Sequence, residues 1–375
     1  MEGGLSFSGI SGGYQALVDA IVRPPRFTYD VEDLGPARFR IGRRRFQRTD
    51  LRVTNERGHA LQLSHYEPLR EERPFERLPC VIYLHGNCGS RMDALDCIPI
   101  LLPYNITLLS LDFSGSGISE GEYVSLGYFE KDDLASIVQH LRDTGTVSRI
   151  GLWGRSMGAA TSLLYGQIDP SIACMVLDSP FSSLTKVAKE LVESAQVKIP
   201  KMMVNLGLRM IRKTILSKVK FDINKLEPIA AVESCFIPAL FAHGKDDTFI
   251  GVHHSNELYA KYAGDKNLIL VEGDHNSARP RFFFDSVTIF FHNMLLTEEE
   301  QRENENGTGR KKSDAASEPL TNNVPDEAEV YNRPRQPLEE PTTEELEEEM
   351  LRQAIFLSLQ EQGSDLFTST TQQES

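Results

Sequence analysis

The fold of this chain is decided by one stretch, Arg149-Ile-Gly-Leu-Trp-Gly-Arg-Ser-Met-Gly-Ala-Ala-Thr-Ser-Leu-Leu-Tyr165. Its first apolar run predicts a buried β-strand that ends at Gly154, and helix-forming residues follow Gly158 at once. A serine on so sharp a strand-to-helix turn is lifted clear of the sheet edge, where its hydroxyl can reach a substrate carbonyl. The Gly-x-Ser-x-Gly pattern around Ser156 therefore predicts a nucleophile.

The context of this pattern matters more than the pattern itself, because the chain contains it three times. Residues 9–13 belong to a small-residue N-terminal segment with no strand before them, and residues 117–121 belong to a glycine-rich loop with no helix after them. We interpret both as loops. Only the copy centred on Ser156 has the strand before it and the helix after it that the chemistry requires.

The acidic charge of the chain is concentrated in its C-terminal part. The formal net charge is −14, and residues 297–375 carry 20 Asp or Glu against 7 Lys or Arg, a net of −13. The preceding residues are thus close to neutral, and the low isoelectric point says nothing about substrate. No basic stripe with interleaved aromatic residues occurs, so we do not expect a nucleic-acid partner.

Cysteine usage and the terminal sequences indicate a reducing compartment. The five cysteines are odd in number and form no Cys-x-x-Cys pair, so we expect neither a disulfide framework nor a structural metal site, and no cofactor is implied. The chain shows no signal-peptide pattern, no apolar run long enough to span a membrane and no lipidation motif. We expect a cytoplasmic protein, with the nucleus as an alternative.

Alternating buried strands and helices define the domain between residues 46 and 296. Residues 46–53 and 60–66 alternate apolar with polar around a turn, which predicts an N-terminal antiparallel hairpin. Continuous apolar runs follow, with helical segments between them, and this alternation predicts a mainly parallel, doubly wound sheet covered by helices on both faces. The predicted parallel strands are 81–84, 106–111, 150–153, 172–177, 239–242 and 268–271.

The other segments are assigned by composition. Residues 1–45 are an N-terminal extension in which Tyr14 to Val22 favours a short amphipathic helix. Residues 182–233 are a helical cap insertion, either a lid with a solvated basic face or one whose Met-rich face admits an acyl chain while its basic face contacts an anionic membrane. Residues 297–343 predict a disordered linker, 344–363 a helix and 364–375 a disordered tail.

An activated serine needs a base and an acid to orient that base, which follow it along the chain in this type of sheet. His275 comes directly after the last predicted strand and is the predicted base; His253, His254 and His292 lie in or at helical segments. For the acid we favour Asp247, which follows the turn after the strand 239–242. Asp246 and Asp178, the latter at the end of the strand 172–177, remain alternatives.

An oxyanion hole needs two backbone N–H donors. Met157, the residue after the nucleophile, is one expected donor. The glycine-rich loop His85-Gly-Asn-Cys-Gly89 follows the first parallel strand and presents amides to a ligand, and we expect Asn87 N–H to be the second donor. His85 is expected to hold this loop in place.

The ordered motifs resemble those of the α/β-hydrolase superfamily, nearest its serine-aminopeptidase-like group, which is also similar to the protein-depalmitoylating enzymes; two of them resemble plant α/β-hydrolases. The resemblance covers residues 45–296 and implies the α/β-hydrolase fold, with Ser156, Asp247 and His275 as triad and Asn87 and Met157 as oxyanion hole. The cap matches no branch of known substrate. The motifs are Leu84-His-Gly-Asn87, Asp112-Phe-Ser-Gly-Ser-Gly-Ile-Ser-Glu-Gly121, Gly154-Arg-Ser-Met-Gly158, His243-Gly-Lys-Asp-Asp247 and Gly273-Asp-His275.

The predicted C-terminal helix resembles a ubiquitin-interacting motif, with an acidic block before Leu-x-x-Ala-x-x-x-Ser-x-x-Glu. Small residues on its apolar face would let a partner surface come close, although one short helix implies weak binding. A solvated helix, or one docked on its own domain, is the alternative. The expected ubiquitin-binding residues are Leu351, Ala354, Ile355, Ser358 and Glu361.

The sequence thus predicts a serine hydrolase that cleaves an ester or thioester through an acyl-enzyme intermediate, with a tethered ubiquitin-binding helix. The substrate is expected to be a small acyl ester or thioester, or an acylated protein. Two alternatives remain open. One is a peptidase of the serine aminopeptidase type, and the other is a non-catalytic ligand-binding or ubiquitin adaptor on the same fold.

Overall fold

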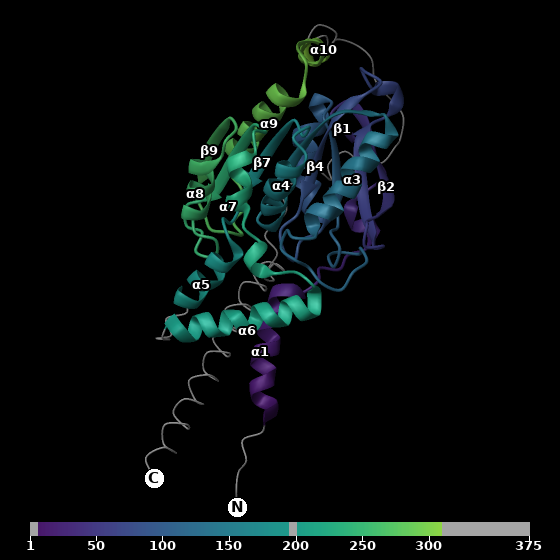
Figure 1. The fold of residues 1–375 in the computed structure, drawn as a ribbon. Helices are drawn as coiled ribbons and strands as arrows, with labels where there is room; N and C mark the ends of the chain where they lie inside the picture. The colour runs from purple at the N-terminus through teal and green to yellow at the C-terminus, as the bar shows by residue number, and fades with distance from the viewer. Residues whose placement is uncertain (1–6, 195–200, 310–375) are drawn as a thin grey trace, which may run out of the picture.

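The computed structural model describes residues 7–194 and 201–309 of the 375-residue chain. The proposed ubiquitin-binding helix at 344–363, the tail after it and most of the predicted linker lie outside the described residues. Within them, a central sheet carries helices on both faces, and further helices lie at one end of the sheet (Figure 1).

Nine strands form one sheet in the order β1-β2-β3-β5-β4-β6-β7-β8-β9. The first three and β5 pair antiparallel, and the strands from β5 to β9 pair parallel. The predicted hairpin followed by a parallel sheet is therefore confirmed. The strands are β1 Arg38–Ile41, β2 Arg44–Thr54, β3 Ala60–Pro68, β4 Leu78–Leu84, β5 Thr107–Leu111, β6 Val147–Arg155, β7 Cys174–Asp178, β8 Ala239–Gly244 and β9 Lys266–Val271.

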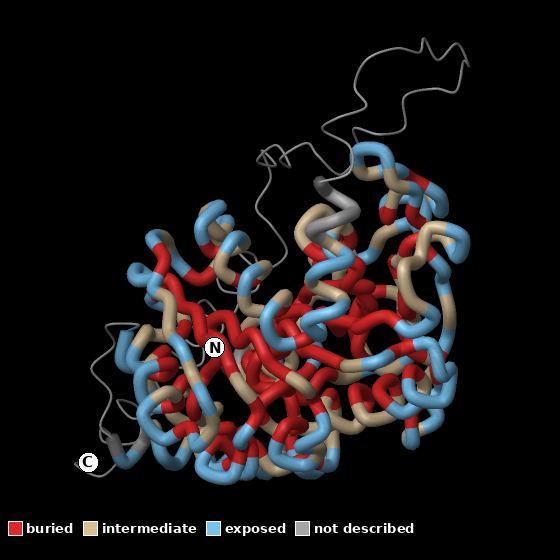
Figure 2. The backbone as a smooth tube through the Cα atoms, turned by 90° about the horizontal axis from the view of Figure 1, so that it is seen from above, coloured by how far each residue is buried: buried red, intermediate tan, exposed pale blue. Residues whose placement is uncertain are grey.

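Burial on both faces explains the continuous apolar runs of the central strands. Every residue of β4, β5, β7 and β8 is buried, as expected for parallel strands covered by helices on both sides. One core cluster packs α3 (Glu130–Thr144), α4 (Met157–Ile168) and α8 (His253–Lys261) on the sheet. A second packs α2 (Ile98–Leu101) and α9 (Arg281–Leu295) on the other face, and Figure 2 shows the buried backbone gathered in the centre.

The cap consists of α5 (Leu184–Ser194), α6 (Lys201–Val219) and the short α7 (Pro228–Ala231), with a 3-10 turn at Ile223–Lys225. An N-terminal helix, α1 (Phe7–Val22), joins it, as Figure 1 shows where α1 meets α6. Tyr14 and Thr214 share a hydrogen bond of 2.6 Å between their hydroxyls, and Lys218 pairs with Asp19 at 2.8 Å. The predicted short helix at 14–22 is thus part of a longer helix that packs on the cap.

Three elements differ from the sequence-based expectations. The sheet begins at β1, before residue 46, because Phe39 and Phe46 pair across β1 and β2 and stack in the core. The helix expected at 91–102 is mostly a 3-10 turn, Arg91–Cys97, followed by α2. The motif copy at 9–13, interpreted as a loop, lies within helix α1.

The start of the predicted linker is also helical, in α10 (Glu298–Gly309). Thr297 and Glu300 form reciprocal side-chain-to-backbone hydrogen bonds of 2.6 and 3.2 Å, which is a capping box. Three glutamates in the first turn complement the helix dipole. Asn304 attaches this helix to the domain through the carbonyl of Tyr104, at 2.9 Å.

Candidate active site

Ser156 occupies the turn between β6 and α4. Its φ of 50° is rare for a residue with a side chain, and its N–H donates to the carbonyl of Asp178 at 2.7 Å. The flanking glycines allow this turn to close. A Cβ on Gly154 would lie 2.3 Å from the Gly158 oxygen, and one on Gly158 would lie 2.0 Å from the Leu84 oxygen. The two glycines of the pattern are therefore required because there is no room for a side chain within the turn or between α4 and the end of β4.

His275 joins Ser156 to Asp247. Its Nε2 lies 3.0 Å from the Ser156 Oγ, and its Nδ1 lies 2.6 Å from Oδ2 of Asp247. Because an ionised carboxylate only accepts hydrogen bonds, Nδ1 carries the proton and the neutral ring accepts at Nε2. The serine hydroxyl therefore donates to the imidazole, which is the arrangement that raises the nucleophilicity of a serine.

Three hydrogen bonds and a neighbouring imidazole hold Asp247 as a carboxylate. Its side chain is fully buried, and its Oδ1 accepts from the N–H groups of Phe249 and Ile250 at 3.1 and 2.7 Å. His243 Nε2 lies 3.2 Å from the same Oδ2 that receives His275. Burial alone would raise the pKa of Asp247, but the two neighbouring imidazoles, His243 and His275, outweigh it and hold that pKa below its ordinary value.

The other candidate acids lie elsewhere. Asp178 is buried against the guanidinium of Arg279, which opposes the effect of burial and lowers its pKa. Asp246 accepts the N–H of Gly273 at 3.3 Å. Of the three carboxylates considered from the sequence, Asp247 is the one that the structure places against His275.

The other candidate histidines also have separate surroundings. His292 is on α9, and its ring lies edge-on to that of Tyr104. His253 and His254, at the start of α8, both contact Glu190 of α5 at 2.9 Å. The structure thus brings Ser156 and His275 together and leaves these three histidines outside the site.

Glu190, His253 and His254 place three metal-ligand atoms within 4.8 Å of one another. The backbone N–H of Ser182 donates to His254 Nδ1 at 3.2 Å, so Nε2 carries the proton and donates it to Glu190. A protonated Nε2 has no lone pair for a metal. In this tautomer the cluster connects α5 of the cap to α8 of the core.

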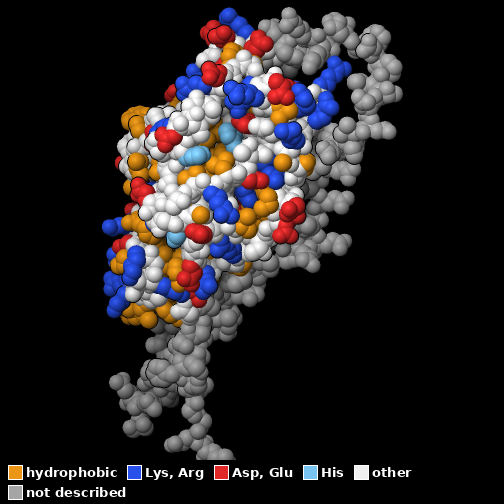
Figure 3. All heavy atoms as spheres, turned by 90° about the vertical axis from the view of Figure 1, so that its right-hand side faces the viewer, with side chains coloured by type: hydrophobic (Ala, Val, Ile, Leu, Met, Phe, Trp, Pro, Cys, Tyr) orange, Lys and Arg blue, Asp and Glu red, His pale blue; other side chains and the backbone are white. Residues whose placement is uncertain are grey.

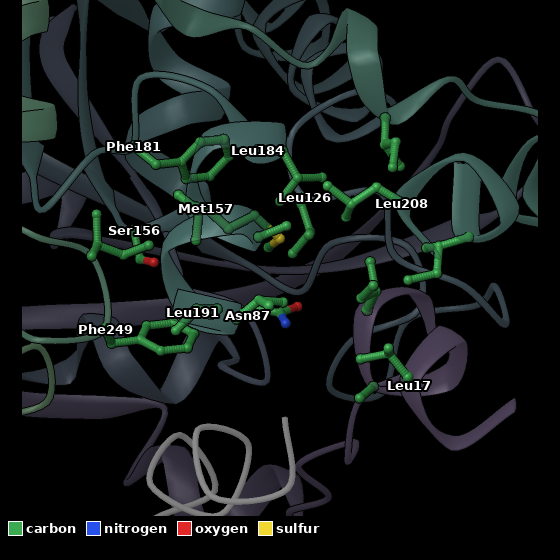
Figure 4. A pocket seen from close by; sticks show the side chains of 18 residues that line it. Leu17, Asn87, Leu126, Ser156, Met157, Phe181, Leu184, Leu191, Leu208 and Phe249 are labelled. Carbon is green, nitrogen blue, oxygen red and sulfur yellow. The ribbon is translucent and has the colours of Figure 1, made fainter. Parts of the chain in front are cut away.

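Asn87 and Met157, the expected oxyanion-hole donors, both line the pocket beside Ser156 (Figure 4). Met157 is the first residue of α4, where backbone N–H groups are free of intrahelical acceptors. The loop that carries Asn87 is held by His85, whose Nδ1 lies 2.7 Å from the Gly86 carbonyl and whose Nε2 accepts the Phe113 N–H at 3.1 Å. His85 therefore has the structural contacts that the sequence suggested.

An apolar pocket opens at Ser156 and holds about 910 Å³ of empty space, its open mouth included. Apart from Ser156 and Asn87, every residue that lines it is hydrophobic. Side chains from the core, the cap and α1 converge on it (Figure 4). The lining residues are Leu17, Ala20, Ile21, Asn87, Leu126, Ser156, Met157, Phe181, Leu184, Val187, Ala188, Leu191, Val192, Leu208, Ile211, Ile223, Phe249 and Ile250.

The Met-rich face of the cap is not the face that lines this pocket. Met202 and Met210 are exposed, whereas Leu208 and Ile211 of the same helix reach the pocket. The expectation that methionines receive an acyl chain is therefore wrong for these two residues. Helix α6 has apolar residues on several sides, and only packing against α1 and α5 decides which side turns inward.

Several residues of the site were missed from the sequence. The motif 243–247 predicts no role for His243, and in the structure its Nε2 lies 3.2 Å from Asp247 Oδ2. Arg155 is the last residue of the strand before Ser156, and its guanidinium donates to the His275 carbonyl at 3.0 Å. The sequence indicated the α1 side chains of the pocket wall only through the amphipathic spacing of residues 14–22.

No helix among the described residues is long and apolar enough to cross a membrane.

Comparisons with known proteins agree with this architecture. Residues 77–228, less than half of the chain, match the family model of serine aminopeptidase, S33. The Bacillus subtilis protein YqkD, itself uncharacterized, is 30% identical over 54% of this chain and 66% of its own length. Lysophosphatidylserine lipase ABHD12 of Danio rerio is 25% identical over 51% of this chain and 49% of its own. The chain thus spans about half to two thirds of these curated relatives.

Solved structures show the fold. The Pyrococcus furiosus esterase Pf2001 superposes with a TM-score of 0.55 at 23% identity, covering 74% of this chain and 98% of the esterase. Acetyl xylan esterase 1 of Thermoanaerobacterium sp. superposes with a TM-score of 0.51 at 17% identity, over 76% of this chain and 94% of that one. The chain therefore has the α/β-hydrolase fold.

Proposed function

We propose that this protein is a serine hydrolase that cleaves an ester or thioester of an apolar acyl group. The observation that carries the proposal is the chain of hydrogen bonds from Asp247 through His275 to Ser156, a residue that lines an apolar pocket. A hydrophobic pocket with few polar groups accepts an acyl chain and leaves the carbonyl at the polar end.

The reaction follows from these positions. His275 Nε2 takes the proton as the Ser156 Oγ attacks the carbonyl carbon, and the N–H groups of Met157 and Asn87 receive the negative charge on the carbonyl oxygen. His275 then returns the proton to the departing alcohol or thiol, which leaves an acyl-enzyme. Water, activated by the same imidazole, releases the carboxylic acid and frees Ser156.

A fluorophosphonate probe tests this proposal directly, because it bonds the serine oxygen to phosphorus as fluoride leaves. We expect the full-length wild type to label and Ser156→Ala to remain unlabelled. Ser119→Ala, at the centre of the copy in the loop 117–121, is the matched control and should label like the wild type. A wild type that does not label, or a Ser156→Ala variant that does, would refute the proposal and favour a non-catalytic adaptor.

The peptidase alternative is less well supported by the pocket. An aminopeptidase has to hold a charged α-amine, and none of the residues that line the pocket is acidic. Comparing an aminoacyl-p-nitroanilide with a p-nitrophenyl ester separates the two. We expect turnover of the ester and little of the anilide, and the reverse preference would establish the peptidase.

Ubiquitin binding by residues 344–363 is a second proposal and rests on the sequence motif alone. In a pull-down with ubiquitin, Ala354→Asp should lose binding because it puts a charge on the apolar helix face. Gln353→Asp, which adds the same charge outside the expected binding residues, should retain it. Equal capture of wild type and Ala354→Asp would eliminate the motif.

A further inference from the structure

Helix α6 is apolar on two faces, and within residues 7–194 and 201–309 only one of them is buried in the fold. On the inner face, Leu208 and Ile211 line the pocket. On the outer face the helix exposes a set of long hydrophobic side chains, which a helix that only covers a core does not need. These residues and their exposed fractions are Met202 80%, Leu206 55%, Met210 50% and Leu216 44%.

Cations without acidic neighbours on the helix share this outer face. Arg209 and Lys213 are exposed and, at 100° per residue, lie on the same side as the hydrophobic set. Helix α6 has no acidic residue between Lys201 and Val219. In the described part of the chain neither Arg209 nor Lys213 forms an ion pair, whereas Arg212 pairs with Asp222.

On the face drawn in Figure 3, hydrophobic and basic side chains, with some acidic ones among them, lie together at the lower end of the coloured surface. Exposed Met and Leu side chains beside exposed Arg and Lys are the composition of a helix that lies in a membrane interface.

We propose that the outer face of α6, defined by Met202, Leu206, Arg209, Met210 and Lys213, docks on a membrane surface that contains anionic lipid. The cations match the negative headgroups, and the flexible hydrophobic side chains enter the acyl boundary. The inner face of the same helix is the pocket wall, so a membrane-held acyl group reaches Ser156 by passing around one helix. This last step rests on the proposed hydrolase function; the docking itself does not.

Vesicle sedimentation of the full-length chain tests the docking, using phosphatidylcholine vesicles and vesicles with about one third phosphatidylserine. We expect the wild type to sediment with the anionic vesicles and far less with the neutral ones, and salt to weaken the binding. Arg209→Gln/Lys213→Gln and Leu206→Ser/Met210→Ser should each reduce bound protein several-fold. The matched controls, Arg40→Gln/Arg43→Gln on the exposed edge of the sheet and Phe282→Ser/Ile289→Ser on α9, should bind like the wild type.

Two further measurements keep the outcomes separate. Hydrolysis of a water-soluble p-nitrophenyl ester should stay the same in the α6 variants, since none of these residues lines the pocket, and this also shows that they fold. Ser156→Ala should bind vesicles like the wild type, so loss of chemistry and loss of docking are distinguished. A wild type that binds neither vesicle, or α6 variants that bind as well as it does, would overturn the docking and leave an acidic protein surface as the occupant.

Discussion

Arg279 and Asp178 form a buried ion pair that anchors the loop carrying His275. The Arg279 Nε and Nη2 lie 2.9 and 3.0 Å from the two oxygens of the carboxylate, and both side chains are at most 5% exposed. Arg279 Nη1 also donates to the carbonyls of Asp274 and Ser277 at 3.2 and 3.1 Å. The end of β7 thereby fixes the position of the imidazole that faces Ser156.

Removing one partner of this pair should destabilise the domain. In Asp178→Ala the guanidinium of Arg279 stays buried without a counter-charge, and we expect a loss of about 3–5 kcal/mol in the free energy of unfolding, measured by urea denaturation. The exposed pair Arg281–Asp285 provides the control, because Asp285→Ala should cost less than about 1 kcal/mol. Similar losses in both variants would contradict the anchoring role.

Asp247 and Asp246 provide a test of the acid that orients His275. Asp247→Asn keeps the shape of the side chain but favours the wrong imidazole tautomer, so kcat for a soluble ester should fall by roughly 10³–10⁴-fold. Asp246→Asn, one residue away and bonded to Gly273, should change kcat by less than about two-fold. A greater loss in Asp246→Asn than in Asp247→Asn would reverse the assignment.

Gly158 should tolerate no side chain. Its substitution by alanine brings a Cβ to 2.0 Å from the Leu84 carbonyl oxygen and 2.8 Å from that of His85, and neither backbone atom can turn aside as a flexible side chain could. We expect Gly158→Ala to lose more than about 3 kcal/mol of stability or to be recovered only as aggregate. Gly145→Ala, which has a positive φ but open space around it, should cost about 1 kcal/mol. Thermal unfolding of both variants decides the comparison.

Narrowing the pocket should shorten the acyl chain that the enzyme accepts. Leu208→Trp fills space in the wall, so kcat/KM for a long-chain p-nitrophenyl ester should fall by about ten-fold or more, with the acetyl ester little affected. Leu206→Trp, on the exposed face of the same helix, is the control and should leave the chain-length profile unchanged. An identical profile for Leu208→Trp would show that the acyl group binds elsewhere.

Acid should weaken the attachment of the cap through His254. Burial lowers the pKa of His254 to about 4, although Glu190 opposes this shift. The unfolded chain therefore binds this proton first, and stability falls from pH 6.5 toward pH 4, by an amount of the order of 1 to 3 kcal/mol. His254→Gln should lose this slope. The stability that Asp247 contributes is present above pH 3.8, because its pKa is depressed in the folded state, and it is lost only as the pH falls below that value. Urea titrations across this range measure the difference.

The sequence determined the sheet and the position of Ser156. A strand buried on both faces has to be continuously apolar, and a turn as tight as the one at Ser156 requires Gly154 and Gly158. Both features depend on residues that are close together in the sequence, so they can be predicted from it. Short-range patterns also located the strand end before His275. The first strand escaped detection because Arg38 to Ile41 offers only four residues, too few to show a period.

The tertiary structure decided which groups meet. Asp178, Asp246 and Asp247 all follow strand ends, and the sequence could only rank them; the contacts of Arg279 and Gly273 occupy the first two and leave Asp247 against His275. The same holds for the two faces of α6. A helix with apolar residues on several sides has no preferred inward face by itself, because only packing against α1 and α5 determines which side chains lose contact with water.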